Sequence, residues 1–163
     1  MNDTNHENRR LAALKRYFVL DSGPETAYDD ITRTVAQTLD VPIAMINMLD
    51  SDRDWFKSRI GTPLTSSLRS TSFCAYLIMR PDEIAVVPDT LLNPQFKDHP
   101  LVTGVPFIRF YAGAPIVTPD RMVIGTLCAY DLKPRTIATA KLAQLATLAS
   151  DVMALLERRI APG

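Results

Sequence analysis

Apolar residues recur at helical spacing at the start of the chain. From about Glu7 to Val19, Leu11, Leu14 and Phe18 follow one another at intervals of three and four, and so share one face of a helix. The turn sequence LDSGPE then ends this helix. A second helix is expected from about Glu25 to Leu39, and its apolar stripe is Tyr28, Ile31, Val35 and Leu39.

The apolar pattern changes to a period of two after these helices. The run PIAMINMLD is apolar on both faces, which predicts a central strand covered on both sides. Its faces are Ile43, Met45, Asn47 and Leu49 against Ala44, Ile46 and Met48. The turn sequence SDRD follows, and WFKSRIG is expected to be the antiparallel partner strand. Alternation gives that strand the faces Trp55, Lys57 and Arg59 against Phe56, Ser58 and Ile60.

The second half of the chain predicts three more strands, a long loop and a helix. IAVVPD is a short strand ended by Pro88, and an irregular loop of the kind that often covers a binding site runs from Thr90 to Val105. Strands 107–116 and 121–131 are joined by the turn sequence TPDR. The last helix spans Thr136 to Arg159. Its apolar stripe is wide enough to cover the sheet and also meet a partner helix: Leu142, Leu145, Leu148, Ala149, Val152, Leu155 and Leu156.

This order of elements predicts an α+β fold, with one domain over residues 1–163. Strands that pair as hairpins, with helices gathered at the termini, are typical of a mostly antiparallel central sheet. Five strands are assigned directly, and a sixth is possible between Arg59 and Thr71. No GxGxxG or GxxxxGK sequence follows a strand, so the order does not support a Rossmann fold.

Composition narrows the partners. Lysine plus arginine and aspartate plus glutamate each number 18, so the formal net charge is zero and neither nucleic acid nor a membrane is an expected partner. Two distant cysteines and two histidines offer no four-ligand zinc site. No apolar run approaches the ~20 residues of a membrane span, and the N-terminus lacks the apolar segment of a signal peptide. A cytoplasmic protein with reduced thiols is expected.

The run FIRFYAGAPI carries one charge, Arg109. Alternation places it with Phe107, Tyr111 and Gly113, where the glycine leaves room for a ligand or another backbone. This face is interpreted as the wall of a pocket, in which Arg109 would form a forked pair with a ligand carboxylate or phosphate. The opposite face is suited to packing on helices: Ile108, Phe110, Ala112 and Ala114.

An internal pair is the alternative for Arg109. Asp89 and Asp98 are examples of such an internal partner, and the pair would fasten the long loop. Several residues of that loop are candidates to close over a ligand, or else to plug the core edge and face solvent: Asn93, Phe96, Lys97, Asp98 and His99.

Motifs along nearly the whole chain, from about Leu11 to Ala154, resemble the GAF domains at the front of bacterial sensor histidine kinases and diguanylate cyclases. They include SFCAYLI, VVPDTLLNPQFKDHPLVTG, IRFYAGAPI and IGTLCAYDLKPR, in the expected order. The resemblance implies a sheet of about six strands, with the terminal helices on one face and a pocket on the other, closed by the short helix and the long loop. GAF domains bind cyclic nucleotides, tetrapyrroles, haem, small acids or nothing known.

The resemblance also sets limits on the ligand and on catalysis. Cys74 lies where phytochrome-type GAF domains attach a bilin, but Ala75 replaces the histidine that normally follows and no Asp-Ile-Pro motif is present. The pattern of the cyclic-nucleotide class does not align with these residues. Free methionine sulfoxide reductases are stand-alone GAF domains, but this chain lacks their cysteine set, so Cys74 and Cys128 are expected to be small buried hydrophobic residues.

The leading hypothesis is a stand-alone sensory module that binds a small molecule without catalysis. It would dimerise through its terminal helices and signal to a separate partner protein. The alternatives are a small redox enzyme and a ligand-free interaction module. The sequence names no cofactor. The candidate ligand-binding residues are Trp55, Phe73, Cys74, Asp89, Phe96, Arg109, Tyr111 and Cys128.

Overall fold

The computed structural model describes residues 2–162, and it has an α+β architecture in three layers. The helices are α1 (Asn2–Lys15), α2 (Thr26–Leu39), α3 (Pro100–Thr103) and α4 (Thr139–Arg159). The strands are β1 (Ile43–Leu49), β2 (Arg53–Ile60), β3 (Ser66–Leu68), β4 (Ala85–Val87), β5 (Phe110–Val117) and β6 (Val123–Asp131). Three short 3₁₀ helices are η1 (Arg69–Thr71), η2 (Cys74–Leu77) and η3 (Thr90–Leu92).

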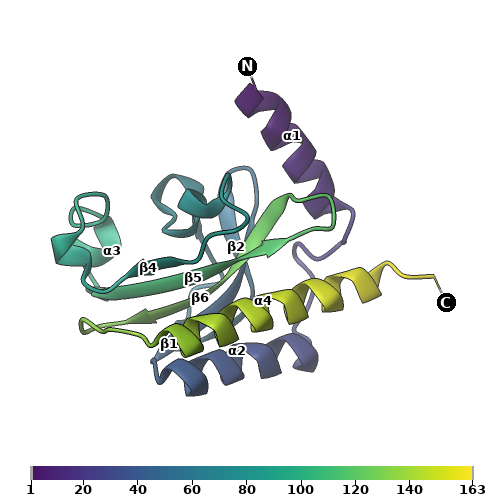
Figure 1. The fold of residues 1–163 in the computed structure, drawn as a ribbon. Helices are drawn as coiled ribbons and strands as arrows, with labels where there is room; N and C mark the ends of the chain where they lie inside the picture. The colour runs from purple at the N-terminus through teal and green to yellow at the C-terminus, as the bar shows by residue number, and fades with distance from the viewer. Residues whose placement is uncertain (1, 163) are drawn as a thin grey trace.

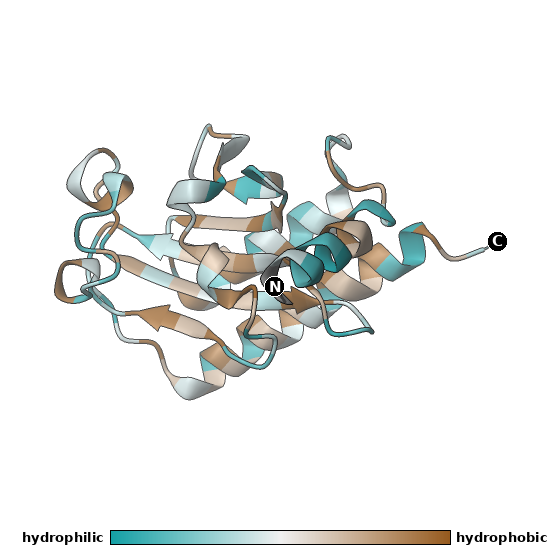
Figure 2. Ribbon diagram, turned by 90° about the horizontal axis from the view of Figure 1, so that it is seen from above, coloured by the Kyte–Doolittle hydropathy of each residue, from teal (hydrophilic) through white to brown (hydrophobic). Residues whose placement is uncertain are grey.

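The six strands form one antiparallel sheet in the order β3-β2-β1-β6-β5-β4. Helices α2 and α4 lie side by side under one face, while α3 and the irregular segments cover the other (Figure 1). The predicted sheet is therefore confirmed, and its sixth strand is β3. Figure 2 shows hydrophobic residues concentrated in the strands and hydrophilic residues near the N-terminus.

The central position of β1 follows from its apolar sequence. All seven of its residues are buried, because β2 and β6 pair with its two edges and its faces meet two separate cores. Ala44, Ile46 and Met48 pack on the side of α2 and α4. Ile43, Met45 and Leu49 pack on the opposite side, as alternation predicted.

A bulge in β2 overturns the predicted alternation of that strand. Ile46 pairs with Ser58 but the next residue, Asn47, pairs with Phe56, which leaves Lys57 as the extra residue. Ser58 therefore shares the helix side of the sheet with Lys57, and its hydroxyl donates to Asp29 of α2 over 2.6 Å. Phe56 remains on the other side, in the second core.

The first helix ends earlier than predicted. It stops at Lys15, and Phe18 lies beyond it with a left-handed φ of 55° and 78% of its surface exposed. The helix is instead anchored by Arg10, which is fully buried. Its guanidinium bonds both oxygens of Glu7 and donates to the Leu49 carbonyl over 2.6 Å. This contact holds α1 at one end of β1, from which it projects away from the sheet (Figure 1).

The stretch around Arg109 also differs from its prediction. Strand β5 begins only at Phe110, because Phe107 adopts a left-handed φ of 62° that interrupts the extended chain. Alternation therefore does not carry back to residues 107–109. Phe107 is 46% exposed, and Ile108 packs in the second core, not against the helices. From Phe110 onward the predicted helix-facing set is correct, since Phe110, Ala112 and Ala114 all lie on the helix side.

Candidate functional site

A cavity of about 310 Å³ lies on the face of the sheet opposite α2 and α4. Its floor is formed by β1 and β2, one end by Tyr130 of β6, and its cover by two segments: 61–73, which contains β3 and η1, and 105–108. Most of the lining side chains are apolar, as expected for a small-molecule site. They include Ile43, Met45, Phe56, Leu64, Phe73, Leu101 and Ile108.

Two buried polar residues stand in this apolar lining. Asn47 of β1 is 1% exposed and Asp54 of β2 is 3% exposed. The Asn47 amide Nδ2 donates to Asp54 Oδ2 over 3.0 Å, and the Ser72 hydroxyl donates to the same oxygen. The other oxygens, Asn47 Oδ1 and Asp54 Oδ1, are buried and have no hydrogen-bond partner among residues 2–162. Two residues of the cavity wall therefore carry unsatisfied acceptors, and both of these oxygens are shielded from solvent in this structure.

Ser72 is fixed in place by the helical turn that follows it. Its Oγ accepts hydrogen bonds from the backbone N–H groups of Cys74 over 3.1 Å and Ala75 over 3.2 Å. Its own hydroxyl hydrogen is thus free to point at Asp54. This arrangement determines which carboxylate oxygen is occupied and which one is left without a partner.

Burial dominates the electrostatics of Asp54. Removal from water raises the pKa of its carboxyl above the ordinary value, against the opposing effect of the hydrogen bonds from Ser72 and Asn47. Arg69 and Arg10 also favour the charged form, but neither forms an ion pair with Asp54 in the described part of the chain.

An aromatic cluster centred on Phe73 stands beside the cavity. The Phe73 ring lies 4.9 Å from Phe96, 5.4 Å from Tyr111 and 5.6 Å from Tyr130, measured between ring centroids. The His99 ring also packs against it, tilted by 32°, with the two ring centroids 4.2 Å apart. Of these rings, Phe73 and Tyr130 line the cavity itself.

The two cysteines, distant in sequence, meet behind these rings. Cys74 and Cys128 are fully buried, and their Sγ atoms lie 3.0 Å apart. The Tyr111 hydroxyl donates to Cys74 Sγ over 3.1 Å. Burial raises the pKa of the Cys128 thiol well above its ordinary value. Burial acts in the same direction on Cys74, but hydrogen bonds, first from Cys128 and then from Thr126 and Tyr111, lower its pKa.

Gly113 has a different role from the one expected. A Cβ there would lie 2.2 Å from the Tyr111 hydroxyl oxygen. The missing side chain therefore leaves room for the Tyr111 ring, not for a ligand or another backbone.

The eight predicted site residues divide between cavity wall, second core and elsewhere. Phe73 lines the cavity, and Cys74, Phe96, Tyr111 and Cys128 pack in the same core. Trp55 packs on the helix side of the sheet instead. Asp89 caps η3 by accepting a hydrogen bond from the Leu91 N–H over 3.0 Å.

Arg109 lies nearer to the second interpretation, an internal contact that fastens the loop, but its partners are not the carboxylates named for it. Its Nη1 donates to the backbone carbonyls of Val102 over 2.9 Å and Ile108 over 3.2 Å. It is not among the described residues that line the cavity, nor does it pair with Asp89 or Asp98. It does fasten the long loop, but through carbonyl groups and not through a carboxylate.

Sequence reasoning missed Asn47, Asp54, Ser72 and Tyr130. Asn47 gave a usable signal, because it is the one polar residue in an otherwise apolar central strand. Asp54 gave none, because the sequence SDRD was interpreted as a turn, whereas β2 already begins at Arg53.

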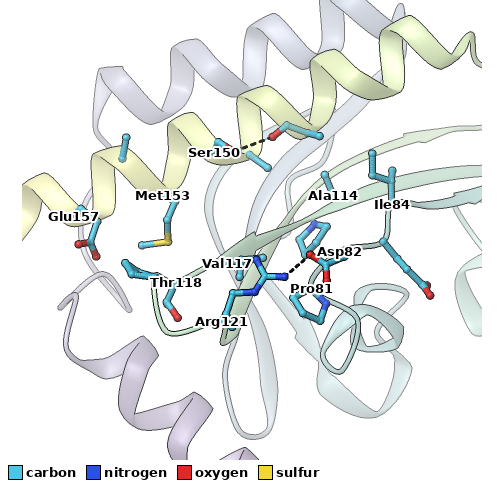
Figure 3. A pocket seen from close by; sticks show the side chains of 16 residues that line it. Pro81, Asp82, Ile84, Ala114, Val117, Thr118, Arg121, Ser150, Met153 and Glu157 are labelled. Carbon is cyan, nitrogen blue, oxygen red and sulfur yellow. Dashed lines mark hydrogen bonds and ion pairs between the residues drawn. The ribbon is translucent and has the colours of Figure 1, made fainter.

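A second hollow, of about 600 Å³, opens between α4 and the edge of the sheet (Figure 3). Met153 and Ser150 of α4 face it, and an ion pair between Arg121 and Asp82 crosses its rim. None of the unsatisfied buried side-chain atoms found among the described residues belongs to its lining. It is larger than the cavity at Asp54 but offers less basis for selective recognition.

Metal-ligand clusters and membrane-spanning helices are both absent from residues 2–162. No cluster of three or more His, Cys, Asp or Glu side chains there has the arrangement needed to hold a metal ion. No helix of that part of the chain has the length and hydropathy to cross a membrane.

Comparison with known proteins shows which family and which relatives the sequence matches. The model of the GAF domain family matches residues 23–156. A cyclic di-GMP phosphodiesterase of Pseudomonas aeruginosa is 38% identical over 149 residues, which are 91% of this chain and 25% of that protein. The chain thus spans about a quarter of the length of this relative.

Solved structures share the fold. The GAF domain of a phosphoenolpyruvate-protein phosphotransferase from Acinetobacter matches with a TM-score of 0.70 and 20% identity, over 99% of this chain and 96% of that one. A type II free methionine-R-sulfoxide reductase from Thermoplasma acidophilum matches with a TM-score of 0.65 and 13% identity, over 82% and 94%.

Proposed function

Because the chain belongs to the GAF domain family, we propose that it is a sensory module that binds a small molecule, without catalysis, in the cavity beside Asn47 and Asp54. The observation that carries this proposal is the pair of unsatisfied oxygens in the cavity wall. An unpaired buried acceptor costs about 1–3 kcal/mol. A ligand that donates hydrogen bonds to Asp54 Oδ1 and Asn47 Oδ1 recovers part of this cost on binding.

The buried thiols favour binding over sulfoxide reduction. A reductase needs a thiolate that its substrate can reach. Cys74 and Cys128 are both fully buried, and neither is among the described residues that line the cavity. Free thiols are also compatible with a reducing compartment, so we place the protein in the cytoplasm as part of this proposal.

Signal output is proposed to pass through the sheet to the helices. Asn47 faces the cavity, while its neighbours Ile46 and Met48 on β1 face the core under α2 and α4. A shift of β1 on binding would therefore reach both helices. We propose a homodimer formed through the terminal helices. The output is assigned to a partner protein or attached domain, for which the phosphodiesterase relative suggests cyclic di-GMP turnover as one class.

The test is a thermal-shift screen of a metabolite library against three proteins: wild type, Asp54→Asn and Asp52→Asn. Asp52 is exposed in the neighbouring turn, so its variant is a matched control for the change in charge. At a hundredfold excess over Kd, a ligand stabilises the folded state by ~2.7 kcal/mol. We expect at least one compound to stabilise wild type and Asp52→Asn but not Asp54→Asn. A library that stabilises none of them would favour a ligand-free interaction module.

A further inference from the structure

Resting on this proposed function, we propose that the ligand is a planar organic cation with two N–H donors along one edge, of the amidinium or guanidinium type. Three features support this class of ligand: the unpaired carboxylate of Asp54, the two free acceptor oxygens, and the aromatic lining of the cavity. It narrows a general small-molecule site to one chemical class.

The charge follows from the surroundings of Asp54. An isolated buried carboxylate is costly, so buried charges are normally paired. The nearby basic residues are already engaged: Arg10 bonds Glu7 and the Leu49 carbonyl, and Arg69 donates to the Asp50 carbonyl over 2.6 Å. No basic side chain among the described residues forms an ion pair with Asp54. A cationic ligand would supply the missing charge, whereas an anion would be repelled.

The number of donors follows from the hydrogen bonds already made. Asp54 Oδ2 accepts from both Asn47 and Ser72, so its two lone pairs are used. A forked cation therefore cannot take both oxygens of the Asp54 carboxylate, as arginine often does. Its two N–H groups would instead bind Asp54 Oδ1 and Asn47 Oδ1, on two adjacent strands, once a small side-chain shift has opened these buried oxygens to the cavity.

The aromatic lining favours a flat ligand. Phe56, Phe73 and Tyr130 all contribute to the cavity wall. Aromatic faces attract cations, most strongly when the cation is desolvated. The volume of about 310 Å³ is at the lower end of the range for ligand pockets, which suits one ring system better than a long chain.

An entrance is present on the covered side. Leu64 and Val105 line the cavity and are themselves exposed, at 48% and 79%. Both residues lie outside the strands, so a ligand that enters between them need not displace a strand.

The experiment compares three probes of nearly equal shape: benzamidine, benzamide and benzoate. Binding of each to the wild-type protein is measured by isothermal titration calorimetry. We expect benzamidine to bind, benzamide to bind at least about tenfold more weakly, and benzoate not to bind. For Asp54→Asn, we expect benzamidine affinity to fall about ten- to hundredfold, the range for a hydrogen bond to a charged group. Asp52→Asn should bind benzamidine like wild type.

Several results would overturn the inference. Benzoate or benzamide binding as tightly as benzamidine would contradict the charge, and an alkylammonium ion binding as tightly would contradict the planar fork. These comparisons need only the wild-type protein, so they hold even if Asp54→Asn fails to fold. If no member of the trio binds while other library compounds stabilise the protein at Asp54, the ligand class is wrong and the proposed function stands. If nothing binds at all, the proposed function itself fails.

Discussion

Asn47 on β1 donates its side-chain amide to Asp54 on β2 over 3.0 Å, and this bond leaves one oxygen of each residue without a partner in the cavity wall. The pair is held by the β1–β2 hairpin and by Ser72, so its orientation is set before any ligand arrives. Such preorganisation lowers the entropic cost of binding.

The free energy of unfolding should depend on pH through the ionisation of Asp54. Burial raises the pKa of this carboxyl in the folded state, while its value in the unfolded chain is about 3.9. Between these two values the folded protein binds more protons, so the free energy of unfolding falls as the pH rises. The loss amounts to about 1.4 kcal/mol for each unit by which the pKa is raised.

Asp54→Asn should remove this dependence. The free energy of unfolding of Asp54→Asn minus that of wild type should be larger at about pH 7 than at about pH 3.5. The reason is that the variant has no carboxyl group that must ionise in the cavity wall. Urea unfolding across this range measures the difference, with Asp52→Asn as the control. Parallel pH profiles for wild type and Asp54→Asn would show that Asp54 is not perturbed.

Phe73 should be the structural centre of the aromatic cluster. Its ring contacts Phe96, Tyr111 and Tyr130 and is 3% exposed, so Phe73→Ala should lower the free energy of unfolding by about 3–5 kcal/mol. Phe18→Ala is the matched control, because Phe18 is exposed, and it should change stability by less than about 0.5 kcal/mol. Chemical denaturation of both variants decides the point. Equal losses would refute this view of the core.

Arg109 should stabilise the loop without taking part in binding. Arg109→Leu removes two hydrogen bonds from a charged donor to the carbonyls of Val102 and Ile108, at an expected cost of about 1–3 kcal/mol. Hydrogen exchange of the amides in residues 100–106 should quicken, while the affinity for a cavity ligand stays near that of wild type. Loss of affinity with unchanged loop protection would instead assign Arg109 to the ligand.

The thiols of Cys74 and Cys128 should be inert in the folded protein. Both are buried, so a thiol reagent should modify them only after unfolding. We also expect no reduction of free methionine sulfoxide in the presence of a dithiol reductant. Turnover that disappears in a Cys74→Ser, Cys128→Ser double variant would establish the redox enzyme instead.

Dimerisation through the terminal helices should place the exposed face of α4 in an interface. Light scattering at tens of micromolar protein is expected to give the mass of a dimer, and Ala154→Glu on that face should shift it towards the monomer. Lys141→Glu, near the other end of the helix, changes the charge without entering the same stripe and serves as the control. A monomer in wild type would end this part of the proposal.

The layers of the fold were predictable because they rest on periodic burial. The stripe of α2 and the two faces of β1 each follow from regular spacing, and both are confirmed. The predictions failed where geometry breaks the period. The bulge at Lys57 moves Ser58 to the helix side of the sheet, and the left-handed Phe107 moves Ile108 into the second core.

The cavity wall was only partly predictable for a related reason. Phe73 could be placed from its motif, but the unsatisfied oxygens depend on which atoms bond to which. Asp54 Oδ1 lacks a partner only because Ser72 and Asn47 both select Oδ2. Likewise, Arg109 was assigned to a carboxylate because sequence patterns do not register backbone carbonyls as partners, and two of them occupy its guanidinium.

A crystal structure of the protein with a compound that stabilises it tests the central claim most directly. We expect the bound molecule in the cavity of about 310 Å³, with N–H groups within hydrogen-bond distance of Asp54 Oδ1 and Asn47 Oδ1. A molecule bound instead in the hollow beside α4, between Met153 and Arg121, would contradict it, as would a cavity in which both oxygens remain unbonded.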